Sequence, residues 1–339
     1  MTPPPRLRIG TRGSTLALTQ SRLVADALEA ALGEPVELVR IRTEGDRLRG
    51  SLVALGGAGV FVAALREAVL DGRCDLAVHS LKDLPTGEAA GLVVVAVPER
   101  ADPRDALCAR DGLTLSALPE GARVGTGSPR RAAQLLSARP DVVIEDIRGN
   151  VGTRLGRVPG LGDTRGTSPQ RADLDAVVLA AAGLARIGRL DAVTELLTPQ
   201  TMSPAPGQGA LAVECRTSLC APDGDPDLAA ALAALDHSPS RLAVTAERAM
   251  LARLEAGCAA PVGGLGRVVD GALVLDAVVC RTDGTTRLTA SSSMALDGLT
   301  PTAQLAGARA LGAEVATLLL TEGAADLAPL GPGREVDEP

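Results

Sequence analysis

"LRIGTRGSTLALTQSRLVADALEAALG", Leu7 to Gly33, contains in order the features that decide the fold. The apolar LRIG is followed by a turn, TRGS, and then by a segment whose apolar residues recur at helical spacing. Gly33 closes that segment as a helix C-cap, because glycine readily adopts the left-handed conformation. The stretch predicts a strand, a glycine loop and a helix, which is the unit of an α/β sheet.

A second copy of this unit follows at residues 122–139, ARVGTGSPRRAAQLLSAR, where VGTGSP aligns with IGTRGS at the first three positions. Two later strands also match, since CDLAVHSLKD (74–83) and LDAVVLAAAG (174–183) each put an Asp-led apolar run before a loop. We predict two α/β units of similar design. We expect the strand in SPAPGQGALAVECR (203–216) to cross back into the first unit.

The last third of the chain has a different pattern. An amphipathic helix is predicted over residues 238–257, with Gly257 as its C-cap. Three strands follow, separated by turns at Asp270-Gly271 and Asp283-Gly284, which is typical of a meander. A final helix, from Thr302 to about Leu320, is expected to pack on this small sheet.

Composition and charge exclude several classes of protein. A chain of 339 residues suggests two or three domains, and we expect three. The net charge of -7 and the single aromatic residue, Phe61, argue against a general nucleic-acid binder. The start MTPPPRLRIG has no apolar run typical of a signal peptide, and no later stretch approaches the roughly 18 apolar residues of a membrane span. We therefore expect a cytoplasmic protein.

The six cysteines are widely scattered, with no C-x-x-C pair, and the chain has only two histidines. Neither a disulfide framework nor a metal site is indicated. Residues 123–157, in contrast, carry seven arginines against three acidic residues in an otherwise acidic chain. This segment predicts a confined anionic ligand.

Several arginines lie at glycine loops between a strand and a helix, where backbone N–H groups favour anions. The first two loops contain Arg12, Ser14, Ser128, Arg130 and Arg131, and a third, DIRGNVGTRLGR, adds Arg148 and Arg154. None of these loops matches a nucleotide-binding motif. Each arginine alone could belong to a solvated face. Together they predict a polycarboxylate site, because guanidinium groups bind carboxylates with two hydrogen bonds.

Lys82 is the only lysine in the chain, among 34 basic residues. It lies with Asp83 at the end of an apolar strand, where open α/β sheets place ligand-binding residues. Three interpretations remain open from the residues alone. Lys82 is a lysine left by chance where others were replaced by arginine, it binds a ligand where a guanidinium does not fit, or it forms a Schiff base. Cys258 follows the predicted helix end and is either a packed thiol or an exposed one that carries a covalent group.

Seven motifs in a fixed order, spread along the chain from Gly10 to Gly263, resemble those of the porphobilinogen deaminases, also called hydroxymethylbilane synthases. These motifs are GTRGSTLAL, GGAGVF, DLAVHSLKDLPT, GTGSPRR, IRGNVGTRL, SPAPGQGALAVECR and TAERAMLARLEAGCAAPVG. The resemblance implies an α/β fold with two periplasmic-binding-protein-like domains around a cleft and a smaller C-terminal α/β domain with a three-stranded antiparallel sheet. The implied domains are 1–99 with 202–217, 100–201, and 221–330, followed by a disordered tail at 331–339.

The resemblance also implies a covalent dipyrromethane cofactor, attached through a thioether to Cys258. The family's cofactor contacts match Lys82, Ser14, Thr126, Ser128, Arg130, Arg131 and Arg148. Its substrate contacts match Arg12, Arg148, Arg154, Arg186 and Gln208. No metal is implied.

The implied reaction is a transfer in tetrapyrrole (heme) biosynthesis. Four porphobilinogen molecules are joined head to tail with loss of ammonia, and hydroxymethylbilane is released by hydrolysis. Asp83 is the implied catalytic residue, because a carboxylate stabilises the cation left when ammonia departs and can shuttle protons. The family is usually monomeric, and neither nucleic acid nor membrane is an implied partner.

The chain departs from the family pattern at Ala54 and Ala58, where many members have lysines, and in its longer loop at 156–173. Arg157, Arg165 or Arg171 in that loop are candidates to replace the missing lysines. Two alternatives remain: a periplasmic-type carboxylate-binding module without catalysis, and a Schiff-base lyase that uses Lys82. Either one predicts a protein without a covalently bound pyrrole.

Overall fold

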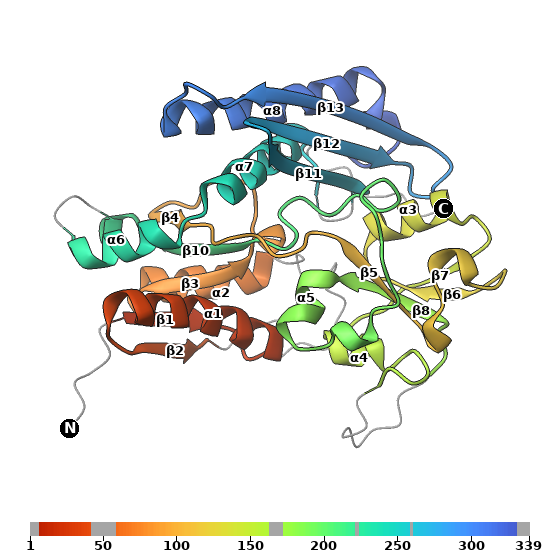
Figure 1. Ribbon diagram of the computed structural model, residues 1–339, viewed down its shortest axis with the longest axis horizontal. Helices are drawn as coiled ribbons and strands as arrows, with labels where there is room; N and C mark the ends of the chain where they lie inside the picture. The colour runs from red at the N-terminus through yellow and green to blue at the C-terminus, as the bar shows by residue number, and fades with distance from the viewer. Residues whose placement is uncertain (1–6, 42–58, 163–171, 221–223, 258–259, 331–339) are drawn as a thin grey trace. The chain divides into compact units, whose positions relative to one another are not determined.

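The computed structural model describes residues 7–41, 59–162, 172–220, 224–257 and 260–330, with side chains from residue 62 onward in the second range (Figure 1). The chain separates into two compact units, Met1–Ala101 with Gly209–Arg241 and Asp102–Gln208 with Leu242–Pro339.

The first unit contains a five-stranded sheet in the order β2-β1-β3-β10-β4. Its strands are β1 (Leu7–Thr11), β2 (Val36–Arg40), β3 (Leu76–Ser80), β4 (Leu92–Ala96) and β10 (Leu211–Arg216). β1 is parallel to β2 and β3, whereas β10 is antiparallel to β3 and β4. The strand from 203–216 therefore returns to the first sheet, as expected.

Helices cover both faces of this sheet. They are α1 (Thr15–Leu32), α2 (Gly59–Leu70) and α6 (Pro226–Leu235). Leu76 and Val78 of β3 pack in one cluster with α1 and α6, and Ala77 packs in another with α2. Successive residues of a strand point to opposite faces, so α1 and α6 lie on one face and α2 lies on the other. Helix α1 ends as predicted, with Gly33 left-handed at φ 70°.

The second unit repeats this plan in the sheet β7-β6-β8-β5-β9. Its strands are β5 (Asp105–Ala109), β6 (Arg123–Gly125), β7 (Val143–Glu145), β8 (Ala176–Ala180) and β9 (Glu195–Leu196), and its helices are α3 (Pro129–Ala138), α4 (Val151–Leu155) and α5 (Ala181–Arg186). β6 is parallel to β7 and β8, and β5 is antiparallel to β8 and β9. Both copies of the predicted strand, loop and helix thus occupy the same place in their sheets.

The C-terminal part forms the predicted meander, β11 (Val262–Val269), β12 (Ala272–Cys280) and β13 (Arg287–Ala295), with all pairings antiparallel. Asp270 and Gly271 both have positive φ, as a two-residue hairpin turn requires. Helices α7 (Ser238–Arg253) and α8 (Pro301–Thr321) share one apolar core with the sheet. The predicted fold class is confirmed by these three sheets. The boundaries of three separate domains stay a prediction.

Helix α7 ends earlier than predicted. Its last residue is Arg253, and the left-handed residue that closes it is Glu255 (φ 49°), not Gly257. The N–H of Ala256 then bonds to the carbonyl of Leu251 at 3.3 Å, and that of Glu255 bonds to Ala252 at 3.1 Å. This pair of bonds is a Schellman cap, which satisfies the last carbonyls before glycine is reached. Among the described helices, none is both long and apolar enough to span a membrane.

A buried carboxylate in α7 joins the C-terminal sheet to the loop that carries Gln208. Glu247 has no exposed surface and accepts hydrogen bonds from the N–H groups of Gly207 (2.6 Å) and Gly266 (2.7 Å). Replacing Glu247 with alanine leaves both donors buried and unpaired, which costs about 1–3 kcal/mol per donor. We expect Glu247→Ala to unfold at a lower urea concentration, with a free energy of unfolding reduced by this cost. The exposed Glu255→Ala is the control, and an unchanged midpoint for Glu247→Ala would contradict the assignment.

Candidate functional site

The predicted catalytic residue Asp83 and the predicted cofactor contact Lys82 lie at the carboxyl end of β3. A 3₁₀ turn, Leu81–Asp83, follows the strand directly, and its Leu81 is buried and donates its N–H to the Ala210 carbonyl at 3.0 Å. Lys82 and Asp83 are both exposed on this turn. The buried leucine therefore anchors the turn while the two charged side chains face outward.

Arg12 and Ser14 lie at the same edge of the sheet, because β1 and β3 are parallel neighbours and their carboxyl ends coincide. The Ser14 hydroxyl caps α1 by accepting the N–H of Ala17 at 3.3 Å. A hydroxyl that accepts in this way still has its O–H to donate. The first glycine loop thus brings Arg12 and Ser14 to the edge of the sheet where Lys82 and Asp83 lie.

A buried charge network lies behind this edge, and sequence reasoning missed it. Glu214 of β10 accepts hydrogen bonds from Arg66 Nε (3.1 and 3.2 Å) and Nη2 (2.9 Å). His79 Nε2 approaches the same carboxylate to 3.2 Å, as an electrostatic contact without hydrogen-bond alignment. Burial would raise the pKa of Glu214, but His79 and Arg66 outweigh it and hold the pKa below its usual value. A single acid inside the apolar strand LAVECR was the available signal.

The second glycine loop is shaped by its own side chains. Thr126 is buried, and its hydroxyl accepts the N–H of Ser128 at 3.2 Å. Gly127 is required for a close approach, since a Cβ there would lie 2.6 Å from the carbonyl oxygen of Ile147. Ser128 occupies the N-cap position of α3 without a side-chain capping bond. The loop therefore places a serine hydroxyl at the start of the helix that carries Arg130 and Arg131.

Arg130, Arg131 and Gln208 converge on one buried carboxylate, Asp105. Arg130 Nη2 donates to Asp105 Oδ2 at 2.7 Å, and Arg131 Nε and Nη2 donate to Oδ1 at 2.9 and 2.7 Å. Gln208 Nε2 donates to Oδ1 at 2.9 Å. Burial would raise the pKa of Asp105, but the two arginines and Gln208 lower it to about 2.

Each arginine also donates to a backbone carbonyl, whereas the buried Arg130 Nε has no hydrogen-bond partner. Arg130 Nη1 donates to the carbonyl of Ser203, and Arg131 Nη1 donates to that of Val178 at 3.1 Å. Two guanidinium groups share one carboxylate, so the cluster keeps an excess positive charge. Sequence reasoning missed Asp105, although an acid at the start of an apolar strand was visible in PRDALCA.

Arg148 and Arg154 extend this positive charge along the carboxyl edge of β6, β7 and β8, which are parallel. Arg148 Nε lies 3.2 Å from Asp146 Oδ2, and Arg154 Nε donates to the Gly149 carbonyl at 2.8 Å. The pKa of Arg154 is lowered first by burial and then by the charges of Arg131 and Arg148, which outweigh Asp146. An anion bound here would relieve that repulsion, so the donor set fits a ligand with several carboxylates.

Arg186 follows β8 at the end of α5, at the same edge, and burial lowers its pKa. Arg157 is paired with Asp173, with Nη2 to Oδ2 at 2.9 Å, so a carboxylate already binds this candidate for the missing lysines. Cys258, Ala54, Ala58, Arg165 and Arg171 lie outside the described residues. In the part of the chain that the structure describes, no group of three His, Cys, Asp or Glu side chains could hold a metal ion.

Comparisons with known proteins show which family the chain belongs to. The family model described as "Porphobilinogen deaminase, dipyromethane cofactor binding domain" matches residues 7–220, and the one for the C-terminal domain matches residues 241–321. A porphobilinogen deaminase of Leifsonia xyli is 56% identical over 96% of this chain and 94% of its own length. A porphobilinogen deaminase of Cutibacterium acnes is 56% identical over 96% of this chain and 97% of its own length.

Among solved structures, a periplasmic substrate-binding protein of an ABC transporter from Coxiella burnetii covers 71% of this chain and 94% of its own, at 15% identity and a TM-score of 0.41. The assignment rests on the family models and on the curated relatives, which span both compact units. This chain belongs to the porphobilinogen deaminase family.

Proposed function

We propose that this enzyme joins four porphobilinogen molecules head to tail, with loss of ammonia, on a dipyrromethane primer bound through Cys258, and releases hydroxymethylbilane by hydrolysis. The observation that carries the proposal for these residues is the cluster of Arg131, Arg148 and Arg154, where burial and then the charges of the other two arginines lower the pKa of Arg154. Each pyrrole of the substrate carries an acetate and a propionate. Fixed guanidinium groups offset the repulsion among these carboxylates and the cost of desolvating them.

The residues divide into holding and reacting groups. The primer supplies, when bound, the pyrrole end to which the first substrate unit is joined. Its carboxylates would be held by Arg130, Arg131, Arg148, Ser14, Lys82, Thr126 and Ser128, and those of the substrate by Arg12, Arg148, Arg154, Arg186 and Gln208. Arg130, Arg131 and Gln208 are buried and already bind Asp105, so they would contribute mainly the positive charge of the two guanidinium groups, with few donors to spare.

Asp83 would act on the substrate itself. Its exposed carboxylate stabilises the cation that forms when ammonia leaves the aminomethyl carbon, and it accepts the proton lost from the attacked pyrrole carbon. Lys82 would bind a carboxylate next to it, because a compact ammonium fits where a planar guanidinium does not. These roles need no Schiff base.

The intact mass of the purified protein tests the proposal. We expect an excess equal to two porphobilinogen units less their ammonia, and we expect Cys258→Ser to lack it. Cys280→Ser is the matched control, since Cys280 is a buried cysteine of the same unit. A wild-type protein without any adduct after incubation with porphobilinogen would favour the carboxylate-binding module.

We also propose that the enzyme works as a cytoplasmic monomer. The porphobilinogen substrate is a small molecule, and no step of the proposed reaction requires a second protein chain. Light scattering of the purified protein should give the mass of one 34.3 kDa chain. A dimer mass that persists on dilution would overturn this part alone.

A further inference from the structure

Two cysteines of the first unit lie in direct contact, away from the proposed site. Cys215 Sγ and Cys220 Sγ are 3.3 Å apart. Cys215 is buried in β10, and Cys220 is exposed at the end of a 3₁₀ turn, Thr217–Cys220. Cys74, Cys108 and Cys280, the other free cysteines that the structure describes, are buried. One thiol of the pair is therefore accessible, and its neighbour is already within reach.

The surroundings show which sulfur would move. Cys215 is held in the sheet, where it pairs with Leu76 of β3 and Val93 of β4. Its backbone is therefore fixed by two neighbouring strands. A disulfide bond is about 2.05 Å long, so Cys220 must approach by little more than 1 Å. The short turn that carries Cys220 can supply this movement, because it belongs to no sheet.

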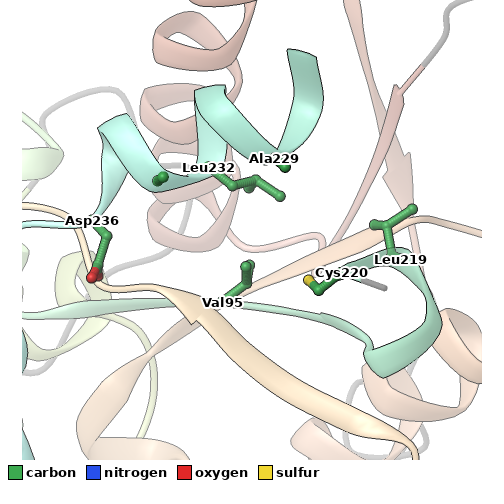
Figure 2. A pocket seen from close by; sticks show the side chains of 7 residues that line it. Val95, Leu219, Cys220, Ala229, Leu232 and Asp236 are labelled. Carbon is green, nitrogen blue, oxygen red and sulfur yellow. The ribbon is translucent and has the colours of Figure 1, made fainter. Parts of the chain in front are cut away.

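Cys220 also lines a cavity of about 280 Å³, whose other walls are Val95, Leu219, Ala229, Leu232, Ala233 and Asp236 (Figure 2). The Asp236 carboxylate is engaged by the N–H of Val97 at 2.7 Å and by Arg241 Nε at 2.7 and 2.8 Å. The rest of the lining is apolar apart from the thiol. The cavity therefore suits a small uncharged molecule, which would contact the sulfur of Cys220 when bound.

We propose that Cys215 and Cys220 are a redox-active dithiol that closes to a reversible disulfide by exchange with a small uncharged disulfide bound in this cavity. In the first step the Cys220 thiolate attacks one sulfur of the small disulfide, which breaks its S–S bond and releases one thiol. In the second step the Cys215 thiolate attacks Cys220 Sγ and releases the second thiol. Two protein thiols are oxidised, and one small disulfide is reduced to two thiols, which take up the two protons.

The order of the steps follows from exposure. Burial raises the pKa of the Cys215 thiol well above its usual value, with a further contribution from the adjacent Cys220. A thiol with a raised pKa is a poor first nucleophile, so the attack on a dissolved disulfide falls to Cys220. The second step is intramolecular, and proximity compensates for the small fraction of thiolate. Intracellular disulfides of this kind are transient redox states and not structural crosslinks.

Peptide mapping tests the proposal, because Arg216 lies between the two cysteines. The reduced full-length protein is incubated with hydroxyethyl disulfide, alkylated and cut with trypsin, without reductant. A Cys215–Cys220 bond links the peptides 190–216 and 217–241, which otherwise separate. We expect this linked pair in the wild-type protein, and we expect dithiothreitol to abolish it.

Variants separate the two steps. Cys220→Ser should yield neither linkage nor adduct, and Cys215→Ala should retain the small-molecule adduct on Cys220. Cys108→Ser, which removes a buried thiol elsewhere, should behave as wild type. An adduct on wild-type Cys220 that never resolves to the linked pair would overturn the proposal, as would complete alkylation of both thiols after the incubation. This readout is independent of catalysis, so its failure leaves the proposed function untouched.

Discussion

Replacing Asp105 with asparagine should lower the free energy of unfolding by about 3–5 kcal/mol, the range found when one partner of a buried ion pair is removed. Asp105 is fully buried and is the shared acceptor of Arg130, Arg131 and Gln208. Asparagine keeps the shape of the side chain but leaves two guanidinium groups buried without their counter-charge. Urea unfolding followed by circular dichroism measures the loss.

Asp146→Asn is the matched control, because that carboxylate is exposed beside Arg148 and exposed ion pairs contribute about 0–1 kcal/mol. The pH dependence gives a second check. The folded pKa of Asp105 is about 2, below the unfolded value of 3.8, so its stabilisation is present above pH 4 and is lost as pH falls through 2. The difference between the folded and the unfolded pKa of Asp105 corresponds to roughly 2 kcal/mol of folding stability. An Asp105→Asn protein with the same acid dependence as wild type would contradict the assignment.

Asp83→Asn should reduce kcat by about 10²–10⁴-fold, the usual contribution of a general acid or base. The side chain is exposed on the turn after β3, so the amide should change neither the fold nor the melting temperature. Turnover is measured as the rate of porphobilinogen consumption, and thermal unfolding is recorded on the same samples.

Glu88→Gln is the control for this experiment, since it removes an exposed carboxylate from the same loop. The bound cofactor should be monitored by intact mass, so that a loss of turnover is not confused with a loss of primer. If Asp83→Asn carries its cofactor and turns over at the wild-type rate, the proton-transfer role belongs to another residue.

The motifs and the local elements could be predicted from the sequence because they depend on neighbours along the chain. Apolar spacing and glycine positions predicted both strand, loop and helix units, and Gly33 closes α1 where expected. The Asp270-Gly271 turn was equally readable, since few residues tolerate two successive positive φ angles. The same local motifs, in their order, identified the family. The end of α7 was predicted wrongly because Glu255 adopts the left-handed conformation, which a sequence pattern normally indicates only for glycine.

What only the tertiary structure decided is the partner of each charge and thiol. Arg66 contacts Glu214, 148 positions away in the sequence, because β10 returns to lie between β3 and β4. Asp105 contacts Gln208, 103 positions away, because the loop before β10 lies against β5. A sequence pattern shows that an arginine is present but not whether its donors face a ligand or a buried acid. That choice depends on long-range sheet order and on the cost of burying an unpaired charge, which favours pairing a buried guanidinium with a carboxylate, as Arg130 and Arg131 pair with Asp105.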